Sequence, residues 1–159
     1  LVEKIEETSR ETMNNMSDIV WSIEPANDSF ENVIKKMRHF GQQMASSLNM
    51  TVEFSCEPAI QRLSLDMMQR KNIYLIYKEA INNACKHSNG SVIKTILRKQ
   101  DGSLNMTISD NGIGFNVKQE SLGHGIANLE TRASAIGGKL SIKSSRSEGT
   151  TVCLIQSLL

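Results

Sequence analysis

The stretch that decides how this chain folds reads Lys78-Glu79-Ala80-Ile81-Asn82-Asn83-Ala84-Cys85-Lys86-His87. It continues an apolar pattern of helical period, which predicts a helix near residues 65–87. In a helix, residues four, seven and eight positions after Glu79 share its face. That face therefore carries an acid, an amide and two bases: Glu79, Asn83, Lys86 and His87.

These four side chains suit a nucleotide site. A carboxylate, an amide oxygen and an ammonium group within two helical turns can order a water, ligate a hard cation such as Mg²⁺ and contact phosphates. The solvated face of an ordinary amphipathic helix has the same pattern. This segment alone does not decide between the two readings.

Two glycine turns follow the helix. The first, Asp110-Asn111-Gly112-Ile113-Gly114-Phe115, comes directly after Leu104–Ser109, where apolar and polar residues alternate as in a strand with one buried face. The second is Gly123-His124-Gly125, and the residues after it predict a further helix. A helix N-terminus flanked by glycines offers free amides to an anion. The first turn by itself is also consistent with a plain Asp-Gly-type loop.

The order of the motifs carries the inference. The chain shows Glu79-x3-Asn83-x2-Lys86-His87, then Asp110-x-Gly112-x-Gly114, then Gly123-x-Gly125, then Glu148-Gly149-Thr150. This series resembles the ATP-binding superfamily shared by histidine kinases, gyrase and mismatch-repair ATPases, over about residues 30–159. The residues around Lys78 and Lys86, and the short gap from Phe115 to Gly123, are similar to sensor histidine kinases of the nitrate-sensor and desaturase-sensor types.

The resemblance implies a Bergerat-type ATP-binding fold and a role for each polar motif residue. Asn83 would ligate Mg²⁺, and Glu79 would be the acid of the same motif, able to polarise a nucleophile or a water. Lys86 and His87 would be the basic pair near the phosphates. Asp110 would accept a hydrogen bond from the amino group of adenine.

The resemblance gives the glycines roles as well. Gly112 and Gly114 would let backbone and base approach closely. Gly123 and Gly125 would lie where the lid over the phosphates ends, and Thr150 would lie near the adenine. Because residues 116–122 form a shorter lid than is usual in the family, we expect them to cover ATP only partly.

Residues 1–24 are predicted to form a separate amphipathic helix about 35 Å long. Its pattern consists of residues at three- and four-residue spacing: Leu1, Ile5, Thr8, Thr12, Met16, Ile19 and Ile23. Pro25 ends this helix, and residues 25–29 form a linker to an ATP-binding domain at 30–159. An ordinary packing helix of the same domain is the alternative. The resemblance favours the second helix of a dimerisation hairpin, because Asp18–Ile23 is similar to the end of such a helix.

The phosphoacceptor histidine of such a kinase is expected upstream of this chain. The three histidines are His39, His87 and His124, and none forms a His-Asp or His-Glu pair on an exposed amphipathic helix. The resemblance therefore implies the catalytic half of a homodimeric kinase. It would transfer the terminal phosphoryl group of ATP to an upstream histidine and then to an aspartate of a response regulator.

Length, composition and charge agree with one domain and an appended helix. The chain has 159 residues, 39% of them hydrophobic, which is enough to fill a core. A net charge of +1, with one Trp, two Tyr and four Phe, argues against a nucleic-acid partner. The three cysteines have no metal-ligand spacing, so we expect buried thiols. No apolar run reaches the roughly 20 residues of a membrane span. We expect this part to be cytoplasmic without membrane contact, although full-length sensors of this type are often anchored upstream.

The predicted fold class is α+β, a two-layer sandwich of helices on one mixed sheet. The expected elements are helices near 30–48, 65–87 and 125–136, strands near 50–55, 139–144 and 150–156, and a hairpin through Asp101-Gly102. ATP would lie between the motif helix and the loop after the hairpin. Two alternatives stay open: a serine kinase of the anti-sigma-factor type, and a docking module with a degenerate nucleotide site.

Overall fold

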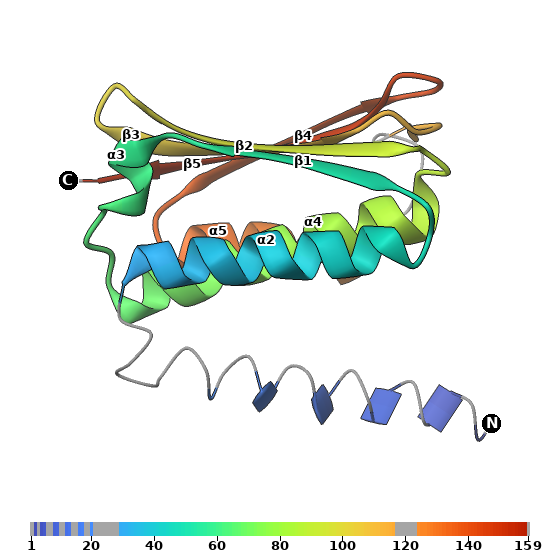
Figure 1. The fold of residues 1–159 in the computed structure, drawn as a ribbon, viewed down its shortest axis with the longest axis horizontal. Helices are drawn as coiled ribbons and strands as arrows, with labels where there is room; N and C mark the ends of the chain where they lie inside the picture. The colour runs from blue at the N-terminus through green and yellow to red at the C-terminus, as the bar shows by residue number, and fades with distance from the viewer. Residues whose placement is uncertain are drawn as a thin grey trace.

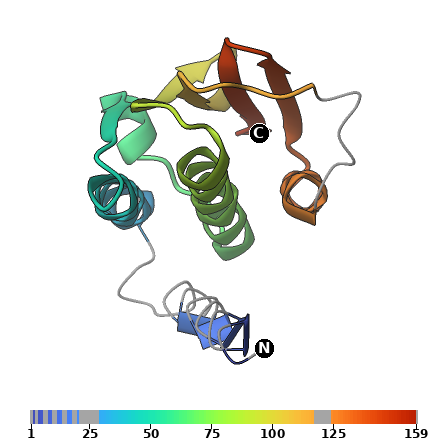
Figure 2. The same cartoon turned by 90° about the vertical axis from the view of Figure 1, so that its right-hand side faces the viewer.

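The computed structural model describes residues 29–116 and 124–158, together with individual helical positions between residues 2 and 20. A five-stranded sheet forms one layer, and α2, α4 and α5 lie side by side against one of its faces (Figures 1 and 2). In chain order the elements are α2 (Phe30–Ser46), β1 (Thr51–Cys56), α3 (Pro58–Gln61), α4 (Met67–His87), β2 (Val92–Gln100), β3 (Ser103–Asp110), α5 (His124–Ala135), β4 (Lys139–Ser145) and β5 (Gly149–Ser157).

The sheet is mixed, with strand order β1-β2-β3-β5-β4. β1 runs parallel to β2, and every other neighbouring pair is antiparallel. Parallel strands need a long crossover, and α4 supplies it here. The β2–β3 hairpin turns at Asp101 and Gly102, whose φ angles of 49° and 71° are those of the tight turn that Asp-Gly favours.

The core lies between the sheet and the helices. Because successive strand residues point to opposite faces, β3 buries Leu104, Met106 and Ile108 and leaves Asn105 and Thr107 partly exposed. The helices contribute buried aromatic and aliphatic side chains to the same cluster, among them Phe30, Met37, Ile73, Tyr77, Ile81 and Leu129. The opposite face of the sheet is not covered by any described helix.

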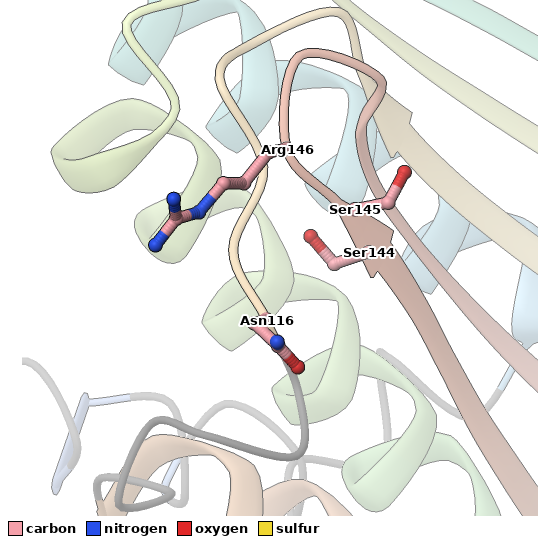
Figure 3. Close-up of a pocket in the computed structure, with 4 residues that line it drawn as sticks. All are labelled: Asn116, Ser144, Ser145 and Arg146. Atoms are coloured by element: carbon pink, nitrogen blue, oxygen red, sulfur yellow. The ribbon is translucent and has the colours of Figure 1, made fainter.

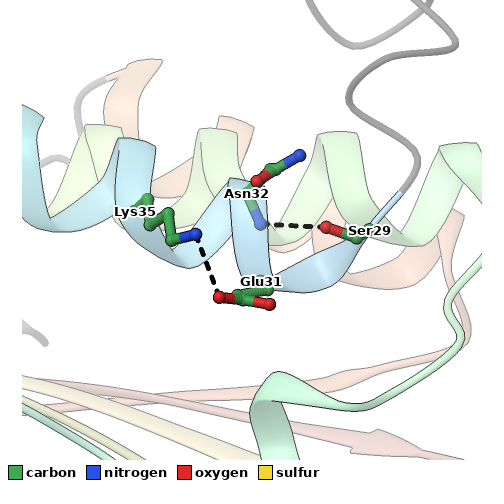
Figure 4. Close-up of polar contacts among 4 residues, drawn as sticks. All are labelled: Ser29, Glu31, Asn32 and Lys35. Atoms are coloured by element: carbon green, nitrogen blue, oxygen red, sulfur yellow. Dashed lines mark hydrogen bonds and ion pairs between the residues drawn. The ribbon is translucent and has the colours of Figure 1, made fainter.

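Helix α2 begins with a conventional N-terminal cap. Ser29 Oγ accepts a hydrogen bond of 3.3 Å from the backbone N–H of Asn32. One turn further on, Lys35 Nζ lies 2.9 Å from Glu31 Oε1, an exposed pair at i,i+4 spacing (Figure 4). These local contacts define where the helix starts, and its buried face, including Val33 and Met37, holds it against α4.

Helix α4 is fixed at its start by a capping box. Asp66 Oδ1 accepts from the backbone N–H of Gln69 at 2.8 Å, and Gln69 Oε1 accepts from the backbone N–H of Asp66 at 3.0 Å. The residues from Asn72 to Tyr77 are all buried. This helix is therefore surrounded by protein in its middle and approaches the surface in its first and last turns.

The structure confirms the predicted fold class and the sequence of the main elements. It adds α3, a single turn too short to give a periodic pattern, which buries Ile60. The prediction of buried thiols was wrong, because Cys56, Cys85 and Cys153 are each only half-buried. None of the three forms a disulfide. The described positions from 2 to 20 are helical, whereas residues 21–28 lie outside the described part, so the division at 24 and 29 stays a prediction.

Candidate functional site

Glu79 and Asn83 lie together on the side of α4 that faces the beginning of α5. Both are half-buried. A Cβ atom built on Gly125, in the first turn of α5, would lie 2.6 Å from Glu79 Oε1 and 3.5 Å from Asn83 Nδ2. The structure thus brings together three of the predicted site residues. A side chain at position 125 would require the Glu79 carboxylate to move.

Lys86 and His87 lie one turn further along, in the last turn of α4, and are exposed. The predicted common face therefore divides into a half-buried acid and amide and an exposed basic end. Basic side chains at this end are also stabilised by the helix dipole. Gly123 lies outside the described residues, and His124 begins α5.

Asp110 ends β3, and one of its carboxylate oxygens is held by two backbone N–H groups. Oδ1 accepts from Gly112 at 2.9 Å and from Thr150 at 3.3 Å. Within the described part of the chain, no hydrogen bond falls on Oδ2 of this half-buried side chain. The first oxygen fixes the orientation of the carboxylate, and the second is left to accept from a ligand.

The loop after Asp110 is bound to the end of α4. Ile113 donates its backbone N–H to Ser88 O at 2.7 Å. A Cβ on Gly112 would lie 2.2 Å from the same carbonyl oxygen, so this glycine permits a close approach of backbone to backbone. These contacts join the Asp110 loop to the end of the helix that carries Asn83.

The other side of the loop is bound to the β4–β5 hairpin. Ser147 donates its backbone N–H to Ile113 O at 2.7 Å. Gly114 has a φ of 61°, and a Cβ there would lie 2.0 Å from Ser145 O. Thr150, the last predicted site residue, is half-buried beside Asp110. Asp110, Gly112, Gly114 and Thr150 thus belong to one continuous arrangement.

Sequence reasoning missed two residues that organise this arrangement. Asn111 Oδ1 accepts from the backbone N–H groups of Ser91 and Val92, both at 2.9 Å. Ser144 Oγ lies 2.9 Å from Thr150 Oγ1 and accepts from the backbone N–H of Phe115 at 2.9 Å. A signal for Ser144 exists in the sequence, since it follows Leu140 and Ile142 on the inward side of a strand, where a hydroxyl needs a partner.

A hollow of about 410 Å³ adjoins Ser144 and is lined by Asn116, Ser144, Ser145 and Arg146. Figure 3 shows the Ser144 hydroxyl pointing toward the side on which Asn116 lies, whereas the Ser145 hydroxyl points away. Ser145 Oγ instead donates to the Glu148 carboxylate. Ser144 therefore forms hydrogen bonds with Phe115 and Thr150, whereas Ser145 forms one with Glu148 in the hairpin turn.

The one cysteine near the site contributes no charge at neutral pH. Cys85 precedes Lys86 on α4, and burial raises the pKa of its thiol above the ordinary value of 9.0. A protonated thiol is a poor nucleophile and a poor metal ligand. The polar groups of this region are Glu79, Asn83 and Asp110, with Lys86 and His87 at the exposed end of α4.

The family model described as "Histidine kinase-, DNA gyrase B-, and HSP90-like ATPase" matches residues 68–158, which include every predicted site residue. The chain belongs to this family of ATPases.

Its relatives are named as sensor kinases. It is 28% identical over 149 residues to the sensor histidine kinase LnrJ of Bacillus subtilis, covering 92% of this chain and 35% of LnrJ. It is 36% identical over 92 residues to the sensor histidine kinase YdfH of the same organism, covering 55% of this chain and 23% of YdfH. The chain thus spans between a quarter and a third, roughly, of the length of these relatives.

The fold agrees with a solved histidine kinase. The Acinetobacter baumannii histidine kinase AdeS superposes with a TM-score of 0.72 at 14% identity, covering 99% of this chain and 83% of that chain. The nitrate-sensor or desaturase-sensor subtype stays a prediction. Among the described residues, no helix has the length and apolar character that crossing a bilayer requires.

Proposed function

We propose that this chain is the ATP-binding catalytic part of a sensor histidine kinase. The observation that carries the proposal is the state of Asp110, whose Oδ1 is fixed by Gly112 and Thr150 while Oδ2 is left for a ligand. The loop that holds it is tied to the helix with Glu79 and Asn83. Family membership and the names of the relatives support ATP as the substrate.

The residues present fit an adenine nucleotide. An ionised carboxylate accepts hydrogen bonds and donates none, so the remaining oxygen of Asp110 suits the amino group of adenine. Glycines at 112 and 114 keep side chains out of the loop beside it. The exposed Lys86 and His87 are suited to offset phosphate charge near the last turn of α4.

The residues also fit Mg²⁺, held mainly through the nucleotide. Magnesium prefers hard oxygen ligands and is commonly bound by one or two protein groups together with substrate phosphates. Asn83 offers an amide oxygen and the adjacent Glu79 a carboxylate, and no group of three acidic, histidine or cysteine ligands occurs within the described residues. When bound, Mg²⁺ supplies charge neutralisation for the phosphates.

The reaction we propose is phosphoryl transfer to an imidazole nitrogen on the upstream helix. The bond between the γ-phosphorus and the β–γ bridging oxygen breaks, an N–P bond forms, and ADP leaves. Positioning and electrostatics are the protein's contribution: Asp110 orients the base, and Lys86 offsets phosphate charge. Glu79 accepts a hydrogen bond from the attacking imidazole or from an ordered water. We further propose dimerisation through residues 1–24 and transfer onward to an aspartate of a response regulator.

Calorimetric titration with a non-hydrolysable ATP analogue, with and without Mg²⁺, tests the proposal. Asp110→Asn retains an oxygen for the Gly112 and Thr150 N–H groups but can replace the ligand-facing oxygen with a donor. Since a hydrogen bond to a charged group contributes about 1.5–3 kcal/mol, we expect affinity to fall roughly ten- to a hundredfold. Omitting Mg²⁺ should also weaken binding.

The matched control is Asp101→Asn, the same chemical change in the exposed β2–β3 turn, at the opposite end of β3. It should bind as the unaltered chain does. Equal affinities for the Asp110 variant and the unaltered chain would remove Asp110 from base recognition. No binding by the unaltered chain would contradict the ATP proposal itself.

A further inference from the structure

The sheet face that no described helix covers, called the open face below, carries positive charge in a regular arrangement (Figures 1 and 2). The strand register shows which outward side chains lie at the same level. Lys94 of β2 and Lys143 of β4 lie at one level, connected by residue pairs across β3 and β5. Arg98 and Lys139 lie at a second level, four residues away along the same two strands. All four side chains are exposed, so these cations mark the corners of a rectangle.

The interior of this rectangle is uncharged. It consists of the outward side chains of the two middle strands, which are Asn105, Thr107 and Ser109 of β3 and Thr151, Cys153 and Ile155 of β5. The hydroxyl of Thr107 donates to Cys153 Sγ at 3.8 Å, so side chains of the two strands meet across this floor. Ile155 is 42% exposed. The floor therefore offers hydroxyls, an amide and an exposed apolar side chain.

The open face is more positive than the chain as a whole. Its charged strand residues are the four cations and one anion, Glu53, which gives +3, whereas the complete chain has a net charge of +1. All other residues together therefore carry −2. Glu53 lies outside the rectangle, on β1, and its Oε2 is 3.3 Å from Lys94 Nζ. Within the part of the chain that the structure describes, no ion pair involves Arg98, Lys139 or Lys143.

The rectangle has the dimensions of an α-helix. Neighbouring strands are about 4.8 Å apart, so β2 and β4, which are separated by three spacings, lie about 14 Å apart. Four residues along a strand span about 13 Å. An α-helix with its side chains is about 10–12 Å wide. A helix that lies along the strands therefore fits between the β2 pair (Lys94 and Arg98) and the β4 pair (Lys139 and Lys143), with one flank beside each pair.

We propose that the open face binds an amphipathic α-helix of another protein, with acidic residues on both flanks of an apolar stripe. The stripe lies over Cys153 and Ile155, and carboxylates of the two flanks pair with the β2 pair and the β4 pair. An uncharged centre with a charged rim is the usual anatomy of a protein interface. No aromatic side chain points outward from the described strands, whereas binding of single-stranded nucleic acid uses aromatic stacking. The proposal is independent of the nucleotide site.

A synthetic helical peptide of three heptads tests the proposal. It carries Leu at positions a and d, Glu at e and g on the two flanks, Gln elsewhere and a fluorescein label. Fluorescence anisotropy measures its binding to the whole chain, which added salt should weaken. Lys139→Glu with Lys143→Glu replaces two attractions by two repulsions, so we expect affinity to fall roughly tenfold or more. Lys94→Glu with Arg98→Glu should have the same effect at the other flank.

A second peptide, with Glu on one flank and Gln on the other, tests the geometry. It can bind in either direction along the sheet and place its acidic flank beside either pair. Each double variant removes one of these two orientations, so its affinity should fall only about twofold. Equal losses for the two peptides would overturn a helix lying between the two pairs.

The matched control is Lys35→Glu with Lys71→Glu, the same change of net charge on α2 and α4, which cover the other face. This variant should bind the first peptide as the unaltered chain does. Equal weakening would overturn the proposal, because the net charge of the chain would then govern binding. The open-face variants should bind the non-hydrolysable ATP analogue normally, so the two proposals succeed or fail separately.

Two other occupants give different results. Binding to vesicles of phosphatidylglycerol and phosphatidylcholine, without binding of the peptide, would assign the open face to an anionic membrane surface. A dimer in sedimentation equilibrium that Lys139→Glu with Lys143→Glu abolishes would assign it to a second copy of this chain. Either result would overturn the proposal, as would the absence of peptide binding at low salt.

Discussion

At the scale of single residues, Gly114 has two separate reasons to lack a side chain. Its φ of 61° is in the left-handed region, and a Cβ would lie 2.0 Å from the carbonyl oxygen of Ser145. Gly102 offers a comparison, because its φ is 71° but a Cβ there would meet nothing within 4 Å. Both glycines have a left-handed backbone, but only Gly114 has a close neighbour. Comparing the two positions therefore separates the cost of backbone strain from the cost of steric collision.

We expect Gly114→Ala to destabilise the fold more than Gly102→Ala. The left-handed conformation costs an ordinary residue about 1–2 kcal/mol in both variants. Collision with the Ser145 carbonyl should add roughly 1–3 kcal/mol at position 114 alone. Urea denaturation measures the difference. Equal losses of unfolding free energy would mean that the hairpin moves aside at no cost.

The single residues also show how far sequence reasoning reached. Asp110, Gly112 and Thr150 were predicted from motif order, and the structure places them in one hydrogen-bonded arrangement. Ser144 was not predicted, because its contact with Thr150 spans the hairpin and belongs to no local motif. Local sequence patterns predict local structure, whereas hydrogen bonds between side chains on different strands depend on which strands pair.

At the scale of secondary structure, α2 packs closely against α4 where Gly41 of α2 faces the side chain of Tyr77. A Cβ on Gly41 would lie 2.2 Å from the hydroxyl oxygen of Tyr77 and 3.5 Å from its Cζ atom. Gly41 lies in the interior of α2, where glycine is less favourable than alanine by about 1 kcal/mol. The phenol of Tyr77 therefore explains why this position of the helix lacks a side chain.

The effect of Gly41→Ala should depend on Tyr77. In the unaltered chain we expect it to destabilise the fold by roughly 1–3 kcal/mol, because the methyl group collides with the hydroxyl. In a Tyr77→Phe background the hydroxyl is absent, and the same change should stabilise the fold by up to about 1 kcal/mol. Chemical denaturation of the four variants gives both values. Equal effects in the two backgrounds would exclude the hydroxyl as the cause.

Elements of different length were predictable to different degrees. The capping residues Asp66 and Gln69 are visible in the sequence, and α4 begins at Met67, within two residues of its predicted start. The strands from β2 to β5 follow from alternation and from the Asp101-Gly102 turn. The single turn of α3 has no period to detect, and its buried Ile60 is recognisable only once β2 lies beside it.

At the scale of the whole molecule, the buried Tyr77 links stability to alkaline pH. Burial raises the pKa of Tyr77 above its ordinary value of 10.0, and the Thr95 hydroxyl and the charge of Arg38 oppose this only in part. The Tyr77 and Thr95 hydroxyls are both buried, and neither meets the geometry of a hydrogen bond with a described residue. The folded chain therefore keeps this proton at a pH where the unfolded chain loses it.

Ionisation of Tyr77 should lower the free energy of unfolding only at alkaline pH. Below pH 10 both states hold the proton, and the contribution of Tyr77 to stability is complete. Above pH 10 the unfolded state binds fewer protons, so the free energy of unfolding should fall by up to about 1.4 kcal/mol per pH unit from this group. Urea denaturation between pH 9 and 11 should show a shallower decline for Tyr77→Phe. Parallel declines in the two proteins would contradict this.

The described helices cover only one face of the sheet. Residues on that covered face should therefore tolerate fewer substitutions than residues on the open face. Along β3, residues that face the helices should tolerate few replacements, whereas Asn105 and Thr107 on the other face should tolerate many. In a saturation mutagenesis library, tolerance to substitution should alternate from one residue to the next along the strands. In α4 it should be low at nearly every position from Asn72 to Tyr77. New surface properties can therefore evolve on the open face while the helix-covered face stays constant.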